Sequence, residues 1–201
     1  MDQPLLGALI LVLLAALITI KQVASGSIFE RPPRQPLLWL VNSFNLLFLV
    51  LINPLAALLL LTRKLPGIDP TSVSIAPPWL LTLVEIAGAA IYVTGFVLMG
   101  WALISLARNY QLGGSDPRAA NELIARGPYA HVRHPMYTAA LGIALGLSCL
   151  TQSLACFGAF LVYLNLILAL IPVEEKGLRQ AYGERYEAYR RQVKSLVPRV
   201  Y

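Results

Sequence analysis

Five long apolar runs divide this chain, and its polar residues are concentrated in the connections between them. The runs are Pro4–Ile20, Leu37–Thr62, Trp79–Leu106, Tyr137–Leu150 and Leu154–Ile171. Because about 20 apolar residues in a helix span the hydrocarbon core of a bilayer, the pattern predicts an all-α polytopic membrane protein with about five transmembrane helices.

The last two runs are expected to form a helical hairpin. No Asp, Glu, Lys, Arg or His occurs between Pro135 and Val173, and Thr151–Ser153 is the short polar break that predicts the turn. The first arm, Tyr137–Leu150, has only 14 residues. We therefore expect this arm to be tilted, or to bury part of the polar motif that precedes it.

The C-terminal tail carries a different pattern. From Glu174 onward, apolar and aromatic residues recur at helical spacing, which predicts one cytosolic amphipathic helix. The positions on this face are Leu178, Tyr182, Tyr186, Tyr189 and Val193. We expect the last two tyrosines to pack against the rest of the protein, and the basic residues of the opposite face to suit anionic headgroups.

Composition agrees with a membrane protein. Of the 201 residues, 57% are hydrophobic and 13% are charged, whereas soluble domains carry about 25% charged residues. A single integral-membrane domain is expected over residues 1–201, with three spans in 1–106 and the functional region in 107–201. The first run follows Asp2 without a preceding basic residue, which favours a retained helix over a signal peptide.

The formal net charge is +6, and the basic residues lie beside the apolar runs. With five spans, fourteen of the 16 Lys and Arg residues fall on one side of the membrane. The excess of Lys and Arg on the cytoplasmic side then predicts an outside N-terminus and a cytoplasmic C-terminus. We expect a bacterial inner membrane or an equivalent endomembrane, and no nucleic-acid partner.

Three further polar or reactive groups occur in or near the spans. Cys149 and Cys156 are expected to be buried, inert thiols, with a disulfide across a short turn as the alternative. No cluster has the spacing of metal ligands, so no metal is expected. Glu85 lies inside the third run, where an ionisable residue is a functional candidate, although it is close enough to the end to be hydrated.

The polar segment 127–137, Gly-Pro-Tyr-Ala-His-Val-Arg-His-Pro-Met-Tyr, contains both histidines of the chain. The hairpin predicts that it meets a second polar stretch, Glu174–Glu175, at the cytosolic face. The candidate catalytic groups are therefore Arg133, His134, Glu174 and Glu175. In other interpretations Arg133 only anchors to headgroups, and His131 is a surface residue.

These two stretches lack a Ser or Cys nucleophile with a base, a phosphate-binding loop and a metal-ligand set. Carboxylates and aromatic rings can bind a polar, partly cationic cofactor. Transfer of a group already activated on such a cofactor needs mainly alignment and the exclusion of water. The pattern is thus compatible with a soluble cofactor and an acceptor that arrives from the lipid.

The same stretches resemble a known family. Gly127–Tyr129, Arg133–Tyr137, Glu174–Glu175, Tyr182–Gly183 and the later Tyr186, Tyr189 and Pro198 are similar to the C-terminal signature of the isoprenylcysteine carboxyl methyltransferase and phospholipid methyltransferase group. The resemblance is specific over Leu123–Pro198. It implies a small integral-membrane enzyme that uses S-adenosyl-L-methionine to methylate a lipophilic small-molecule or lipid acceptor.

The resemblance also implies which residues contact the cofactor. They are Gln111, Asn121, Glu122, Leu123, Ile124, Tyr129, His134, Pro135, Met136, Tyr137 and Glu174. Pro135 has the alternative role of starting a helix. His134 can act as a base or only hold the cofactor, and the sequence leaves both roles open.

Leu170 departs from the pattern, because similar prenylcysteine methyltransferases carry an Arg at this position. Without that cation a carboxylate acceptor would be costly to desolvate. A lipid amine, a thiol, or a small lipophilic acid held by another cation such as Arg133 remains open. Two alternatives to a methyltransferase are an NADPH-dependent membrane reductase of the sterol-reductase type and a non-enzymatic membrane factor.

Overall fold

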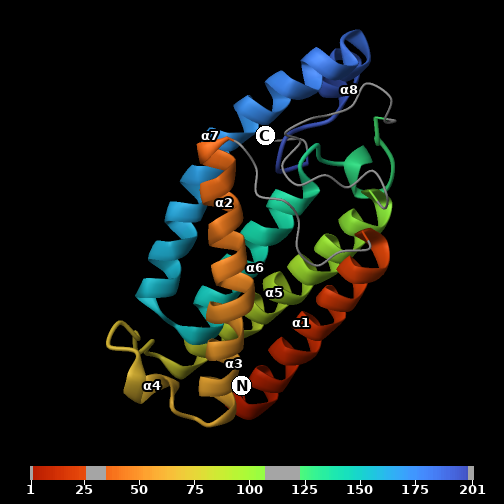
Figure 1. The fold of residues 1–201 in the computed structure, drawn as a ribbon. Helices are drawn as coiled ribbons and strands as arrows, with labels where there is room; N and C mark the ends of the chain where they lie inside the picture. The colour runs from red at the N-terminus through yellow and green to blue at the C-terminus, as the bar shows by residue number, and fades with distance from the viewer. Residues whose placement is uncertain (1, 26–34, 107–122, 199–201) are drawn as a thin grey trace.

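The computed structural model describes residues 2–25, 35–106 and 123–198 (Figure 1). Their regular structure is helical, and the β pairing among them is limited to two isolated bridges. The predicted all-α class is therefore confirmed. The three longest helices are α1 (Gln3–Ser25), α5 (Pro78–Leu106) and α7 (Leu154–Tyr182).

Within the part of the chain that the structure describes, four helical segments are long and apolar enough to cross a membrane. They are Gln3–Ala24, Pro36–Leu61, Pro78–Leu106 and Leu154–Tyr182. The predicted fourth run forms α6 (Pro135–Thr151), whose 17 residues rise by about 26 Å at 1.5 Å per residue. This length is less than the roughly 30 Å of a hydrocarbon core. The fifth crossing stays a prediction.

The second span changes helix type in its middle. It consists of α2 (Pro36–Leu47), the π-helix η1 (Phe48–Ile52) and α3 (Asn53–Leu61). Pro54 lies in the first turn of α3 and has no backbone N–H to continue a regular α-helical ladder. The wider turn of the π-helix comes directly before this proline, so the span remains helical through the interruption.

Two asparagines join this span to neighbouring helices. The Tyr92 hydroxyl of α5 donates to Asn53 Oδ1 at 2.6 Å, and the Tyr163 hydroxyl of α7 donates to Asn45 Oδ1 at 2.6 Å. A polar side chain at membrane depth needs such a partner. Both asparagines therefore face other helices.

Helix α6 packs along α5 at very close range. A Cβ atom added at Gly146 would lie 2.7 Å from the Tyr92 backbone nitrogen and 2.8 Å from the Gly88 carbonyl oxygen. These distances leave no room for a side chain. The small residues of the two helices thus allow their backbones to touch, as in other membrane helix pairs.

The predicted hairpin turn lies at the opposite end of α6 from the polar motif (Figure 1). The loop that follows α4 (Leu65–Ile68) is hydrogen-bonded to this turn. Val73 N donates to Gln152 O at 2.9 Å, and Leu154 N donates to Thr71 O at 3.1 Å. These bonds fix the turn and leave the other end of the hairpin for the functional residues.

Cys149 and Cys156 are free thiols.

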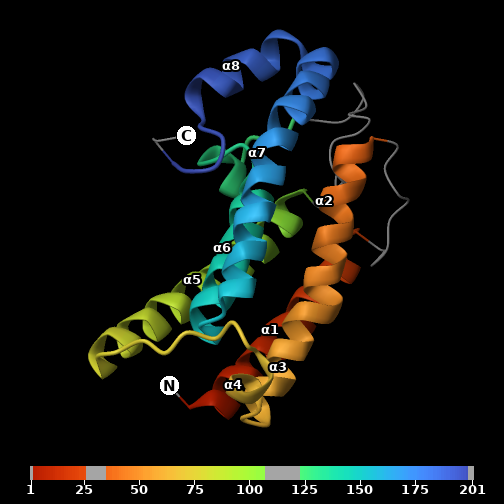
Figure 2. The same ribbon diagram turned by 90° about the vertical axis from the view of Figure 1, so that its left-hand side faces the viewer.

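The tail differs from the prediction. Helix α7 continues through Glu174 to Tyr182, and Gly183, with φ of 54°, separates it from α8 (Glu184–Gln192). This positive φ suits glycine, and the helix ends there. The expectation of a single amphipathic helix from Glu174 to Val193 was therefore wrong. Figure 2 shows α8 turning away from the axis of α7.

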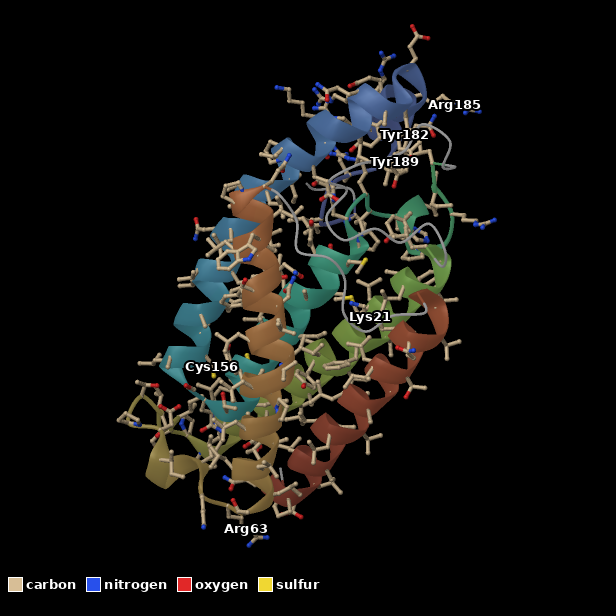
Figure 3. The ribbon with its side chains drawn as sticks, viewed as in Figure 1. Lys21, Arg63, Cys156, Tyr182, Arg185 and Tyr189 are labelled. Atoms are coloured by element: carbon tan, nitrogen blue, oxygen red, sulfur yellow. The ribbon has the colours of Figure 1, made fainter. Side chains whose placement is uncertain are left out.

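The two ends of the bundle carry different side chains. Tyr182, Arg185 and Tyr189 lie at the α7–α8 end, whereas Arg63 lies at the opposite end, beside α3 (Figure 3). Arg63 pairs there with Asp2 at 3.2 Å. Which end faces the cytosol stays a prediction from the charge distribution.

We predict that Gly146→Ala destabilises the protein, because the new methyl group cannot fit between α5 and α6. Overpacking of this kind costs about 1–3 kcal/mol. Gly158→Ala in α7 is the matched control, since a Cβ atom there meets nothing within 4 Å. Thermal unfolding of the detergent-solubilised variants should show a lower Tm only for Gly146→Ala. Equal Tm values for the two variants would contradict the close α5–α6 contact.

Candidate functional site

The polar motif forms a short 3₁₀ helix, η4 (Gly127–Ala130), followed by the start of α6. His134 immediately precedes α6, and Pro135 occupies its first turn. A proline is tolerated there because the N–H that it lacks would have no partner within the helix. Pro135 therefore starts a helix, and its neighbour His134 is placed at the N-terminal end of that helix.

The end of the tail returns to this motif and pairs with its backbone. Arg133 N donates to Lys194 O at 2.8 Å, and His134 N donates to Ser195 O at 3.0 Å. These bonds satisfy donors that precede the first turn of α6. They also bring residues together that are about sixty positions apart in the chain, and the hydrophobic pattern carried no signal of this pairing.

A buried ion pair connects the motif to α7 and to the tail. Arg133 donates to Glu175 Oε1 from Nε at 2.9 Å and from Nη2 at 2.5 Å. Its Nη1 donates to the carbonyl oxygens of Arg190 and Val193. The two paired side chains are only 10% and 7% exposed. This arrangement commits the guanidinium to groups within the protein, and it does not support an anchor to headgroups.

The His134 ring lies between the two adjacent glutamates. Its Nε2 is 3.3 Å from Glu175 Oε1, and its Nδ1 is 3.7 Å from Glu174 Oε2. The ring also stacks on Tyr137, with 5.6 Å between centroids and 16° between planes. The imidazole is buried, and carboxylates and an aromatic face fix its orientation.

Glu174 and Glu175 have different surroundings. Glu175 accepts from Arg133 and also lies 3.4 Å from Arg190 Nε. The Oε2 atom of Glu174 is buried but has no hydrogen-bond partner among the described residues. A buried carboxylate oxygen without a donor is costly. Glu174 thus offers an unused acceptor beside His134.

Two tyrosines of α8 cover this cluster. Burial raises the pKa of the Tyr189 phenol, which donates to the Tyr129 carbonyl oxygen at 2.6 Å. The Tyr186 ring is 1% exposed and makes an edge contact with Tyr189. The prediction that both tyrosines pack is confirmed. The Tyr186 hydroxyl and the Ser195 hydroxyl are also buried without a partner among the described residues.

An apolar cluster borders the motif on the α5 side. Ile124, Tyr129 and Ala102 are buried together, and Met136 packs against them. Leu123 is half-buried directly before Ile124. The predicted cofactor contacts at Gln111, Asn121 and Glu122 lie outside the described residues. The structure therefore brings together the predicted cofactor contacts of the polar motif and the predicted contact Glu174.

Two other candidates lie apart from the cluster. His131 is exposed, as expected, and its ring is 6.4 Å from that of Trp101. Glu85 accepts from Gln152 at 3.4 Å, next to the hairpin turn at the far end of α6. Among residues 2–25, 35–106 and 123–198, no group of three or more His, Cys, Asp or Glu side chains could hold a metal ion.

Comparisons with known proteins give consistent matches. A model of the family described as phospholipid methyltransferase matches residues 83–185. The cobalt-zinc-cadmium resistance protein CzcN of Cupriavidus metallidurans is 31% identical over 104 residues, which cover 51% of this chain and 48% of that protein. Probable protein-S-isoprenylcysteine O-methyltransferases of Oryza sativa, from subspecies indica and japonica, are 31% identical over 124 residues, with 57% of this chain and 61% of theirs covered.

A solved structure shares the fold. The eukaryotic intramembrane Ras methyltransferase, an isoprenylcysteine carboxyl methyltransferase, aligns with a TM-score of 0.54 and 18% sequence identity. The alignment covers 93% of this chain and 74% of that chain. The curated relatives are matched over about half to three fifths of their own length.

We predict that Glu175→Gln strongly destabilises the protein, because it leaves the buried Arg133 guanidinium without its counter-charge. Breaking a buried pair costs about 3–5 kcal/mol. Glu187→Gln is the matched control, since its pairs with Arg179 and Arg190 are about 40% exposed and such pairs contribute about 1 kcal/mol or less. The Tm in detergent should fall much further for Glu175→Gln. Equally small decreases in Tm for Glu175→Gln and Glu187→Gln would show that the buried Arg133–Glu175 pair does not hold the tail.

Proposed function

Because the chain belongs to the phospholipid methyltransferase family, we propose that it is an integral-membrane enzyme that transfers a methyl group from S-adenosyl-L-methionine to a lipophilic acceptor. The matched residues 83–185 include most of α5, the polar motif, the helical hairpin and both glutamates. The shared fold with a membrane methyltransferase supports the same interpretation.

The observation that carries this proposal is the buried Oε2 atom of Glu174, which has no donor among the described residues. Its neighbour Glu175 is satisfied by two arginines. A carboxylate that is held in place but unsatisfied is suited to a ligand that brings an ammonium group or hydroxyl groups. S-adenosyl-L-methionine carries both, so the residues present fit this cofactor.

The surrounding side chains provide the rest of a binding site. Tyr137 stacks on His134, and Tyr129 lies in the apolar cluster that includes Ile124 and Met136. Aromatic faces of this kind can contact an adenine ring or a sulfonium ion. The bound cofactor would supply the activated methyl group. The protein then has to align the two reactants and exclude water.

We assign His134 to positioning rather than to removal of a proton. Both ring nitrogens are directed at carboxylates, Nε2 at Glu175 and Nδ1 at Glu174. The ring would have to leave this arrangement to accept a proton from an acceptor molecule. In our proposal His134 instead keeps its place between the two glutamates at the start of α6, and Glu174 Oε2, 3.7 Å from Nδ1, is left for a ligand.

The acceptor is proposed to be a lipophilic amine or thiol. Leu170 stands where an Arg was expected for a carboxylate acceptor, and it is 1% exposed within an apolar cluster that includes Leu38 and Leu196. Arg133, the other cation considered, is committed to Glu175 and to two tail carbonyls. Neither position offers a cation to an acceptor carboxylate.

We infer a cytoplasmic α7–α8 end, so that a soluble cofactor reaches the Glu174 cluster from the cytosol while the acceptor arrives through the bilayer. A bacterial inner membrane or an equivalent endomembrane fits this arrangement. The family membership does not favour the reductase or the non-enzymatic alternative.

We predict that the detergent-solubilised protein binds S-adenosylhomocysteine and that Glu174→Gln weakens this binding at least tenfold, because a charge-assisted hydrogen bond is lost. Isothermal titration calorimetry measures both affinities. The exposed Glu184→Gln in α8 is the control and should bind as the unsubstituted protein does. Binding of NADPH in place of S-adenosylhomocysteine would overturn the methyltransferase proposal.

We predict that labelled methyl groups move from S-adenosyl-L-methionine to lipophilic thiols or amines, and not to carboxylic acids of the same chain length. The apolar packing of Leu170 gives an acceptor carboxylate no counter-charge. Extraction into organic solvent followed by counting measures the product. Preferential methylation of the acids would show that another cation serves the acceptor.

A further inference from the structure

The Tyr186 hydroxyl is a buried polar group that the arrangement described so far does not use. The side chain is 1% exposed, and its oxygen has no hydrogen-bond partner among the described residues. Tyr189, one turn further along α8, differs in this respect because its hydroxyl donates to the Tyr129 carbonyl at 2.6 Å. A phenylalanine at position 186 would pack equally well, so packing does not explain the hydroxyl.

This hydroxyl lies within the charged cluster of the site. Burial raises the pKa of the Tyr186 phenol, as does the charge of Glu175 and, less strongly, that of Glu174. The Arg133 guanidinium acts in the opposite direction. The phenol therefore stays neutral at physiological pH and can donate a hydrogen bond.

Tyr186 and Glu174 together offer complementary chemistry. The Glu174 carboxylate can only accept, and its Oε2 atom has no donor among the described residues. The neutral phenol can donate a hydrogen bond, and a charged acceptor makes such a bond stronger. A group with an ammonium and a carboxylate on the same carbon would satisfy both side chains at once.

We propose that Tyr186 and Glu174 bind the amino-acid end of the methyl donor, with Glu174 accepting from the ammonium group and Tyr186 donating to the carboxylate. This inference rests on the proposed function and deepens it, because it assigns a tail residue to the ligand. Tyr186 is then a binding residue of α8, and the tail contributes directly to the site that it covers.

The test compares two ligands that differ only in this end. S-adenosylhomocysteine carries the amino-acid group, and 5′-methylthioadenosine lacks it. Calorimetry on the full-length protein in detergent should show that Tyr186→Phe weakens S-adenosylhomocysteine binding about tenfold. The affinity for 5′-methylthioadenosine should stay unchanged, and so should the Tm, because the Tyr186 hydroxyl makes no regular hydrogen bond to the described residues.

Tyr189→Phe is the matched control. It removes a hydroxyl that makes a hydrogen bond within the protein, so it should lower the Tm without a selective effect on either ligand. Equal affinities of Tyr186→Phe and the unsubstituted protein for S-adenosylhomocysteine would overturn the inference, as would an equal loss for both ligands. If the unsubstituted protein binds neither ligand, the proposed function fails instead.

Discussion

The buried ion pair between Arg133 and Glu175 is the interaction on which the candidate site depends. Their side chains are 10% and 7% exposed and lie on segments that meet only through the folding of the hairpin and tail. Two buried charges are costly to desolvate, so the pair persists only with additional hydrogen bonds. The Arg190 and Val193 carbonyls supply these bonds to the guanidinium, and the tail is thereby drawn onto the motif.

The Arg133–Glu175 pair gives different roles to two glutamates that are adjacent in the sequence. Glu175 is satisfied from within the protein, whereas Glu174 keeps a buried oxygen without a donor among the described residues. His134 lies between them and fixes their relation to the start of α6. The Arg133–Glu175 pair and His134 thus fix the surroundings of the unsatisfied Glu174 carboxylate. Such preorganisation suits a reaction that needs alignment more than chemical activation.

The sequence predicted the larger features because they depend on composition and periodicity. The apolar runs predicted the helices, and the polar break at Thr151–Ser153 predicted the turn. The meeting of the motif with Glu174–Glu175 followed from the hairpin. The break at Gly183 was missed because the periodic spacing of apolar residues continues through it, although this one residue with a positive φ redirects the chain. The Lys194–Ser195 backbone pairing was also missed, since backbone hydrogen bonds leave no side-chain pattern.

The most direct test is an experimental structure of the detergent-solubilised protein with S-adenosylhomocysteine bound. We predict that the ligand lies against the start of α6, that it contacts Glu174, and that Glu175 keeps its pair with Arg133. A ligand that binds Glu175 and displaces Arg133, or one that lies away from both glutamates, would contradict the division of roles between Glu174 and Glu175.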